Sequence, residues 1–235
     1  MKKHHLFSAF TVLLLMPATV FLGRQLPGRS YYLTSTLLAL EAMLPFFLCF
    51  EARKPQAREL VLLAVMCALS IAARVVIPFP SFKPTTAIIM LSGIAFGPEA
   101  GFLSGAVSAF ASNFFFSQGP WTPWQMLSYG ISGFLAGVFF HKKAPQAIRS
   151  TKMLLKLSLF SFFCILMISG PLLDCSTLFT ISSVLTKKYV LAVFAAGLPH
   201  NLSHGTASAV TMLLFARPLL QKLGRMQQKY GIGDW

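Results

Sequence analysis

The sequence predicts an all-α, polytopic membrane protein built as a helical bundle. Of the 235 residues, 55% are hydrophobic, and the mean hydropathy is +0.68. Only 11% of the residues are charged, whereas a soluble domain usually carries about 25%. The apolar residues gather in segments long enough to cross a bilayer as helices, and the lysines and arginines lie mostly between them.

Eight apolar segments can be drawn along the chain. They run through residues 6–22, 31–50, 60–77, 85–96, 100–116, 123–140, 153–173 and 189–216. The first contains Pro17, which should kink its helix. The second contains Glu41 and Pro45, and a basic linker follows it.

Prolines and glycines mark most of the later boundaries. The third segment ends at Pro78-Phe79-Pro80, and Gly97-Pro98-Glu99 separates the short fourth segment from the fifth. Gly119-Pro120 ends the fifth. Pro123 suits the first turn of the sixth because a backbone N–H at that position has no partner within the helix. We expect the eighth helix to end just before Arg217-Pro218.

The basic residues predict the orientation of the chain. With both termini in the cytoplasm, five of the 20 lysines and arginines lie outside, Arg74 lies within a helix, and the other fourteen lie inside. The outer five are Arg24, Arg29, Lys83, Lys187 and Lys188. An excess of lysine and arginine on the cytoplasmic side is the usual topology signal. We therefore expect a multi-pass protein of the cell membrane.

The composition argues against several functional classes. The net charge is +14, but basic residues between apolar segments indicate topology and not nucleic-acid binding. The chain has no GxxxxGK[ST], HExxH or GxSxG motif and only six acidic residues. Its four cysteines form no CxxC pair. We predict that the protein is not an enzyme and has no metal site and no cofactor.

A polar, aromatic loop between the fifth and sixth segments is the first candidate site. Residues 113–126 hold two of the three tryptophans, an asparagine, two glutamines and two prolines. Flat aromatic faces and directional amides suit a planar or polar-aromatic ligand, although tryptophan is also enriched at membrane surfaces. The candidate ligand contacts here are Asn113, Gln118, Trp121, Trp124 and Gln125.

The third segment carries two further candidates. Ala64, Ala68 and Ala72 share one helix face, and such a ridge lets a second helix approach closely, either within the bundle or from a partner protein. Arg74 lies about one turn before Pro78, and a charge within a membrane helix points to function. It could contact an anionic or carbonyl group of a ligand, or extend to the membrane surface.

Several other polar residues fall in or beside apolar segments. His200 and His204 are four residues apart, a spacing that can bind metal, but no third ligand is evident and we predict interhelical hydrogen bonds. Asp174 begins a polar connection over 174–188 and should cap a helix or pair with a lysine. Glu41 should be protonated or hydrogen-bonded within the bundle.

Together these features resemble the substrate-binding S components of energy-coupling factor (ECF) vitamin transporters. The resemblance covers residues 58–217. It is carried by the alanine ridge, by Arg74 before Pro78-Phe79-Pro80, by Phe96-Gly97-Pro98-Glu99-Ala100-Gly101 and by Gly197-Leu198-Pro199-His200-Asn201-Leu202-Ser203-His204. The run Gly119-Pro120-Trp121-Thr122-Pro123-Trp124-Gln125-Met126 is similar to members assigned to cobalamin uptake.

The resemblance implies a six-helix bundle in the lipid bilayer that captures a vitamin near the outer face. Cobalamin or another corrinoid is the first expected ligand, and riboflavin is the next. The resemblance also implies that Ala64, Ala68 and Ala72 meet a transmembrane coupling protein, the T component, which two cytoplasmic ATPases drive. The S component is then expected to topple in the membrane to release its vitamin inside.

We divide the chain into three parts on this basis. They are an N-terminal transmembrane hairpin with a basic linker (1–57), the six-helix core (58–217) and a basic cytoplasmic tail (218–235). The hairpin is an addition to the six-helix form and should leave the alanine ridge uncovered. Two alternatives stay open: an intramembrane enzyme acting on a lipid through His200, His204 and Asp174, and a ligand-free membrane scaffold.

Overall fold

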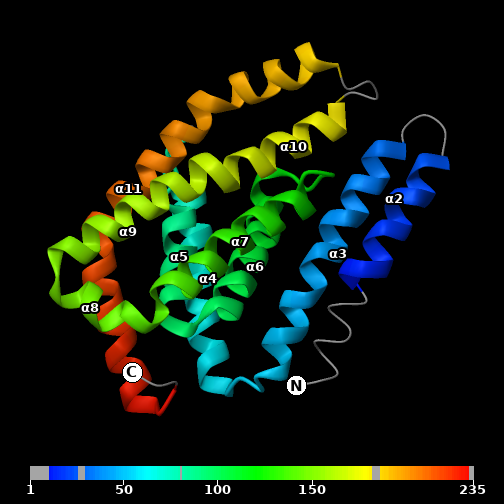
Figure 1. Cartoon of the computed structure of the whole chain (residues 1–235). Helices are drawn as coiled ribbons and strands as arrows, with labels where there is room; N and C mark the ends of the chain where they lie inside the picture. The colour runs from blue at the N-terminus through cyan, green and yellow to red at the C-terminus, as the bar shows by residue number, and fades with distance from the viewer. Residues whose placement is uncertain (1–10, 26–29, 80, 182–185, 233–235) are drawn as a thin grey trace.

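The computed structural model describes residues 11–25, 30–79, 81–181 and 186–232, and within these ranges it is a bundle of helices without strands (Figure 1). The helices are α2 (Met16–Gln25), α3 (Ser30–Ala52), α4 (Ala57–Val76), α5 (Thr85–Phe96), α6 (Pro98–Phe116), α7 (Thr122–Phe140), α8 (Ala144–Arg149), α9 (Thr151–Cys164), α10 (Gly170–Ile181) and α11 (Lys187–Tyr230). Shorter helical turns are η1 (Thr11–Leu15), η2 (His141–Lys143) and η3 (Ile165–Ser169).

The all-α membrane fold predicted from composition is confirmed. Three stretches of the described chain are long and apolar enough to cross a membrane: Leu33–Ala52, Ala57–Val76 and Thr151–Thr180, the last of which joins α9 and α10 through η3. Helix α5 is apolar but shorter. The predicted start of the first helix, Pro80, and parts of the predicted connections (26–29 and 182–185) and tail (233–235) lie outside the described residues.

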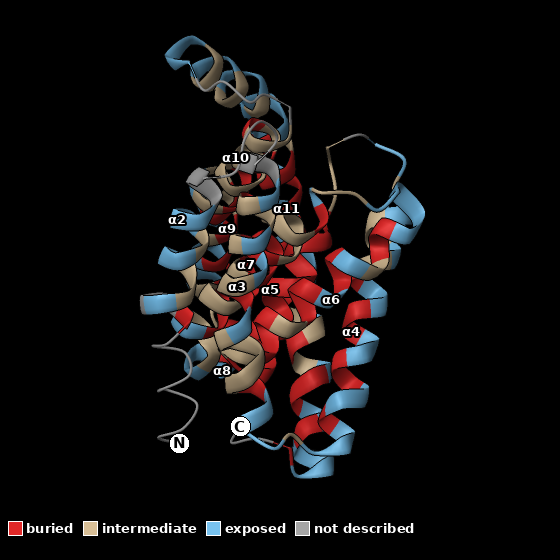
Figure 2. Ribbon diagram, turned by 90° about the vertical axis from the view of Figure 1, so that its right-hand side faces the viewer, coloured by how far each residue is buried: buried red, intermediate tan, exposed pale blue. Residues whose placement is uncertain are grey.

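The centre of the bundle is formed by α5, α6 and α7, whose backbones touch. Every residue of α5 is buried. A Cβ atom on Gly93 would lie 2.0 Å from the carbonyl oxygen of Gly133, and one on Gly133 would lie 2.2 Å from that of Gly101. Small residues at helix interfaces permit this close approach. Figure 2 shows the resulting buried centre.

Helix α4 packs against this centre along one side only. Leu63 and Met66 are buried, whereas Ala64, Ala68 and Ala72 are exposed. Figure 2 shows the exposed side of α4 turned away from the other helices. The ridge therefore faces outward, and its interpretation as packing within the bundle is wrong for this chain.

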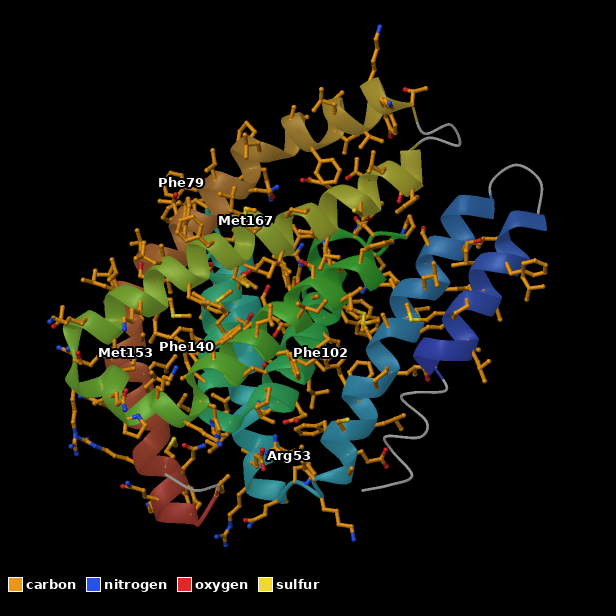
Figure 3. All side chains as sticks on the ribbon, viewed as in Figure 1. Arg53, Phe79, Phe102, Phe140, Met153 and Met167 are labelled. Carbon is orange, nitrogen blue, oxygen red and sulfur yellow. The ribbon has the colours of Figure 1, made fainter. Side chains whose placement is uncertain are left out.

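The N-terminal hairpin is attached to α6 and α7. The ring of Phe46 stacks on Phe102 with centroids 4.0 Å apart, and Phe47 meets the same ring edge-on at 5.7 Å; Phe102 lies inside the bundle in Figure 3. The hairpin leaves the alanine ridge uncovered, as predicted. Within the hairpin, Thr19 of α2 donates to Glu41 of α3 at 2.6 Å, which agrees with the predicted hydrogen bonding of Glu41.

Arg53, in the turn between α3 and α4, ties the hairpin to the core. Its guanidinium donates to Glu59 at 2.9 Å and to the backbone carbonyl of Phe96 at 3.2 Å, and it lies 3.5 Å from Glu99. Figure 3 shows Arg53 at the end of the bundle opposite Phe79. Because these partners begin or end α4, α5 and α6, the hairpin is anchored to three core helices. The domain boundary at residue 57 stays a prediction.

Helix α11 is longer than predicted. It continues through Pro218 to Tyr230 and does not end at residue 216. Leu220 and Leu223 of this extension are buried, and Gln227 Nε2 donates to the backbone carbonyl of Ala95 at 2.9 Å. Packing against the bundle therefore carries the helix past a proline that local propensity alone would take as its end.

Helix α10 also extends beyond its predicted end at residue 173. It runs through Asp174 to Ile181, where the sequence indicates a polar connection. Ser176 and Leu178 are buried, and Phe179 stacks on Trp124 of α7 with ring centroids 5.9 Å apart. The helix continues because its apolar face finds α7 to pack on.

Candidate ligand-binding site

A hydrogen-bonded network joins α4, α6 and α7 at the end of the bundle where the loops after α4 and α6 lie. Arg74 Nη1, in the last turn of α4, donates to Asn113 Oδ1 at 2.9 Å and to the hydroxyl of Ser112. Asn113 Nδ2 donates to Gln125 Oε1 at 2.7 Å and to Thr122 Oγ1 at 3.0 Å. The buried amide of Asn113 therefore links the arginine to the start of α7.

Arg74 has no carboxylate partner among the described residues. The ion pairs there are those of Arg53 with Glu59 and Glu99, at the far end of the bundle. The Arg74 guanidinium lies over the rings of Phe116, 4.9 Å from its centroid, and Tyr129, 5.9 Å from its centroid. The half-buried Arg74 side chain thus contacts groups of the bundle itself, and its predicted contact with a ligand stays a prediction. A cation held by neutral acceptors and rings keeps donors for an anionic or carbonyl group.

A second row of polar side chains crosses from α7 to α11. The rings of Tyr129 and His204 stack with centroids 6.3 Å apart, and His204 and His200 lie 6.2 Å apart. His204 Nε2 is 2.7 Å from the hydroxyl of Thr86 on α5, and His200 Nδ1 is 2.7 Å from that of Ser81 in the loop before α5. The predicted interhelical hydrogen bonding is confirmed, and no group of three metal-ligating side chains occurs within the described ranges.

Asp174 and Asn201 connect α10 to α11 beside this row. Asn201 Nδ2 donates to Asp174 Oδ2 at 3.0 Å, so Asp174 neither begins a helix nor forms an ion pair with a lysine within the described chain. A Cβ on Gly197 would lie 2.2 Å from Asp174 Oδ1. Asp174 and Tyr189 also line a cleft of about 390 Å³ between the two helices.

The two tryptophans of the loop point to different surroundings. Trp121 is 38% exposed and lies over Gly119. Trp124 is half-buried against Phe179 of α10. Gln118 accepts a hydrogen bond from Thr122 at 2.9 Å, which joins it to the Asn113 network. Only Trp121 is therefore placed at the open edge of the polar network.

A family model described as the S component of an ECF-type riboflavin transporter matches residues 54–222. The chain belongs to this family. The matched range begins before α4 and ends within the extension of α11, so the N-terminal hairpin lies outside it. No curated protein and no solved structure matches the chain.

Membership makes the protein a membrane component of an ECF transporter and not an enzyme. The predicted family is confirmed, and the alternative of an intramembrane enzyme acting through His200, His204 and Asp174 is set aside. The description of the family names riboflavin. Nothing in the match supports the cobalamin-type subgroup specifically, so that ligand stays a prediction.

The structure brings most of the predicted ligand contacts of this S component together. Arg74 and Gln125 are both hydrogen-bonded to Asn113. Gln118 is connected to Asn113 through the hydroxyl of Thr122. Trp124 is turned toward α10. Sequence reasoning did not place the histidines or Tyr129 beside Arg74. The signal that could have found them is the pair of histidines four residues apart beside Pro199, because polar rings inside an apolar segment need partners on neighbouring helices.

Proposed function

We propose that this S component captures a flavin-type vitamin, riboflavin first, at the end of the bundle where Arg74 lies. The observation that carries the proposal is the Arg74 guanidinium, held inside the bundle by Asn113, beside the Tyr129 ring and without a carboxylate. A planar ring system with carbonyl oxygens accepts hydrogen bonds from such a cation and stacks on aromatic side chains. The family description favours the same ligand class.

The charge bias of the loops supports placing this end of the bundle at the outer membrane face. A vitamin bound there would reach the cytoplasm only through a change of the whole component, powered by a separate module. We propose the exposed Ala64, Ala68 and Ala72 face of α4 as the contact for a transmembrane T component that two ATPases drive. An exposed ridge of alanines suits close packing by another helix.

Ligand identification is the direct test. The full chain, purified in mild detergent, should carry or bind riboflavin, detected by its absorbance, its fluorescence and mass spectrometry. Riboflavin at a hundredfold excess over its Kd should stabilise the fold by about 2.7 kcal/mol, or roughly 5–10 °C in Tm for a chain of this size. A rise in Tm with cobalamin alone would show that the ligand is cobalamin and not riboflavin, and the proposed role in vitamin uptake would stand. No shift with any vitamin would favour a ligand-free scaffold.

The tryptophans give a sharper test of where the ligand lies. Trp121→Ala should weaken riboflavin binding about tenfold, because a lost aromatic stacking contact costs roughly 0.5–1.5 kcal/mol beyond the buried area. Trp124→Ala should instead lower Tm, since its ring packs on Phe179. Fluorescence titration and thermal unfolding of both variants measure this. Equal affinity of Trp121→Ala and the native protein would remove Trp121 from the site.

A further inference from the structure

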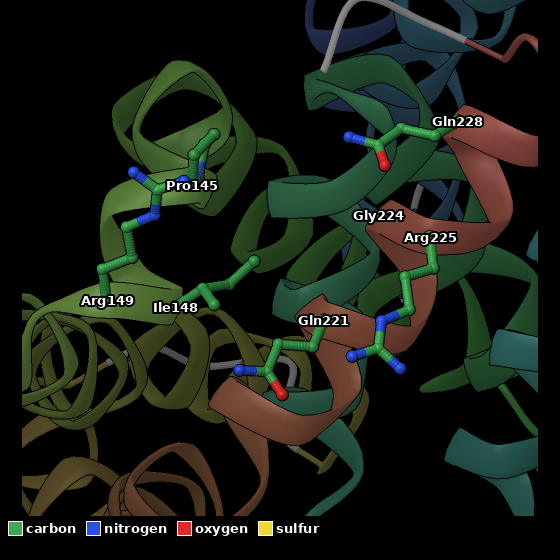
Figure 4. A pocket seen from close by; sticks show the side chains of 7 residues that line it. All are labelled: Pro145, Ile148, Arg149, Gln221, Gly224, Arg225 and Gln228. Carbon is green, nitrogen blue, oxygen red and sulfur yellow. The ribbon is translucent and has the colours of Figure 1, made fainter.

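A basic pocket lies between α8 and the C-terminal part of α11, at the end of the bundle opposite the Arg74 network. Its volume is about 480 Å³. Figure 4 shows Arg149 and Ile148 on the α8 wall and Arg225, Gln221 and Gln228 on the α11 wall. The α8 wall therefore carries one guanidinium group, which lies beside Pro145 in Figure 4, and the α11 wall carries one guanidinium group and two amides.

The charge of this pocket is not neutralised by the described part of the protein. No acidic side chain lines it. The carboxylates of Glu59 and Glu99 are already engaged by Arg53, and neither Arg149 nor Arg225 forms an ion pair within the described ranges. Arginine forks bind phosphate oxygens in pairs, and glutamine amides add further donors. The chemistry of the lining suits a phosphate group.

The place of the pocket indicates which phosphate it meets. The apolar stretch Thr151–Thr180 begins two residues after Arg149, so the pocket lies where the chain enters the membrane. Beyond it, Leu155 and Leu159 of α9 are 49% and 58% exposed and face outward from the bundle. Basic pockets between membrane helices at this level bind lipid headgroups. A soluble anion would gain nothing from the apolar surface that continues below.

We propose that the α8–α11 pocket binds the phosphate headgroup of an anionic phospholipid. Arg149 and Arg225 hold the phosphate from opposite walls, Gln221 and Gln228 donate to its free oxygens or to the headgroup hydroxyls, and Ile148 with the exposed face of α9 contacts the start of an acyl chain. Such a lipid adds a contact between α8 and α11 beside the place where the two helices already pack on each other. The site is independent of the vitamin site at the other end.

The test compares phosphatidylglycerol with phosphatidylcholine added to the full chain in neutral detergent at about 150 mM salt, where charges more than about 8 Å apart are screened. Native mass spectrometry should show one retained phosphatidylglycerol, and this lipid alone should raise Tm. Arg149→Gln with Arg225→Gln should weaken that binding about tenfold or more. Arg149→Lys with Arg225→Lys keeps the positive charge but loses the paired hydrogen bonds of the guanidinium groups. The affinity of this variant for phosphatidylglycerol should lie between those of the native protein and the glutamine variant.

The matched control removes two other exposed charges from the same end, Lys54→Gln with Lys142→Gln, and should change affinity by less than about twofold. Circular dichroism and riboflavin binding report that each variant is folded. An equal loss in the control would overturn the proposal in favour of general surface attraction. Unchanged binding in the arginine variant would also overturn it. Equal binding of free glycerol phosphate would assign the pocket to a soluble phosphate ester and not to a lipid.

Discussion

Ala68→Trp should abolish uptake of the vitamin and leave its binding intact. Ala68 is in the middle of the exposed ridge of α4, between Ala64 and Ala72. If a helix of the T component packs there, an indole would hold the two backbones apart. Overpacking a close contact costs roughly 1–3 kcal/mol or more, which weakens association about 5- to 150-fold or more. The measurement is riboflavin uptake into proteoliposomes that contain the ATPases and the T component.

Ala18→Trp is the matched control for this variant. Ala18 is an exposed alanine on α2 of the hairpin, away from the ridge, so the same enlargement there should leave uptake within about twofold of the native rate. Co-purification of the T component with each variant shows whether lost uptake comes from lost association with the T component or from a transport step after association. Native uptake by Ala68→Trp would show that the ridge is not the coupling face. Loss of ligand binding by the same variant would mean that it disturbs the fold.

Composition and breaker residues were sufficient to predict most of the fold. The helix assigned to 85–96 ends and the helix assigned to 98–116 begins where Gly97-Pro98 indicates. Local chain chemistry decides these boundaries, because proline and glycine act on their own backbone. The predicted end of the last helix before Pro218 was wrong, because burial of Leu220 and Leu223 outweighs the tendency of proline to end a helix.

The candidate site was predictable where a residue type is unusual for its place. Arg74 and Asn113 are costly within apolar segments, so each demanded a partner, and each is the other's partner. The tryptophans gave no such direction. Trp121 and Trp124 are three residues apart, but only Trp124 packs against the end of α10, where it stacks on Phe179. Which face a helix buries depends on elements that are distant in sequence, and the sequence indicated a polar connection from residue 174 onward, where α10 continues.

Arg74→Gln should weaken riboflavin binding strongly without destabilising the free protein. In the native structure the guanidinium has neutral partners only, Asn113 and Ser112, and a cation within the membrane without a counter-charge is costly. Glutamine removes that cost and offers a neutral amide in its place. A hydrogen bond from a charged donor is worth about 1.5–3 kcal/mol, so affinity should fall about 10- to 100-fold, while Tm of the ligand-free protein stays level or rises.

Arg53→Gln provides the opposite case within the same chain. Arg53 is paired with Glu59, which is buried, and with Glu99, so its removal leaves a buried carboxylate without its partner. The expected cost is about 1–3 kcal/mol, or roughly 2–10 °C in Tm, with riboflavin affinity unchanged. Titration and thermal unfolding of both variants form one experiment. If Arg74→Gln lowers Tm as Arg53→Gln does and keeps native affinity, Arg74 serves the fold and not the ligand, and the proposed site loses the residue on which it rests.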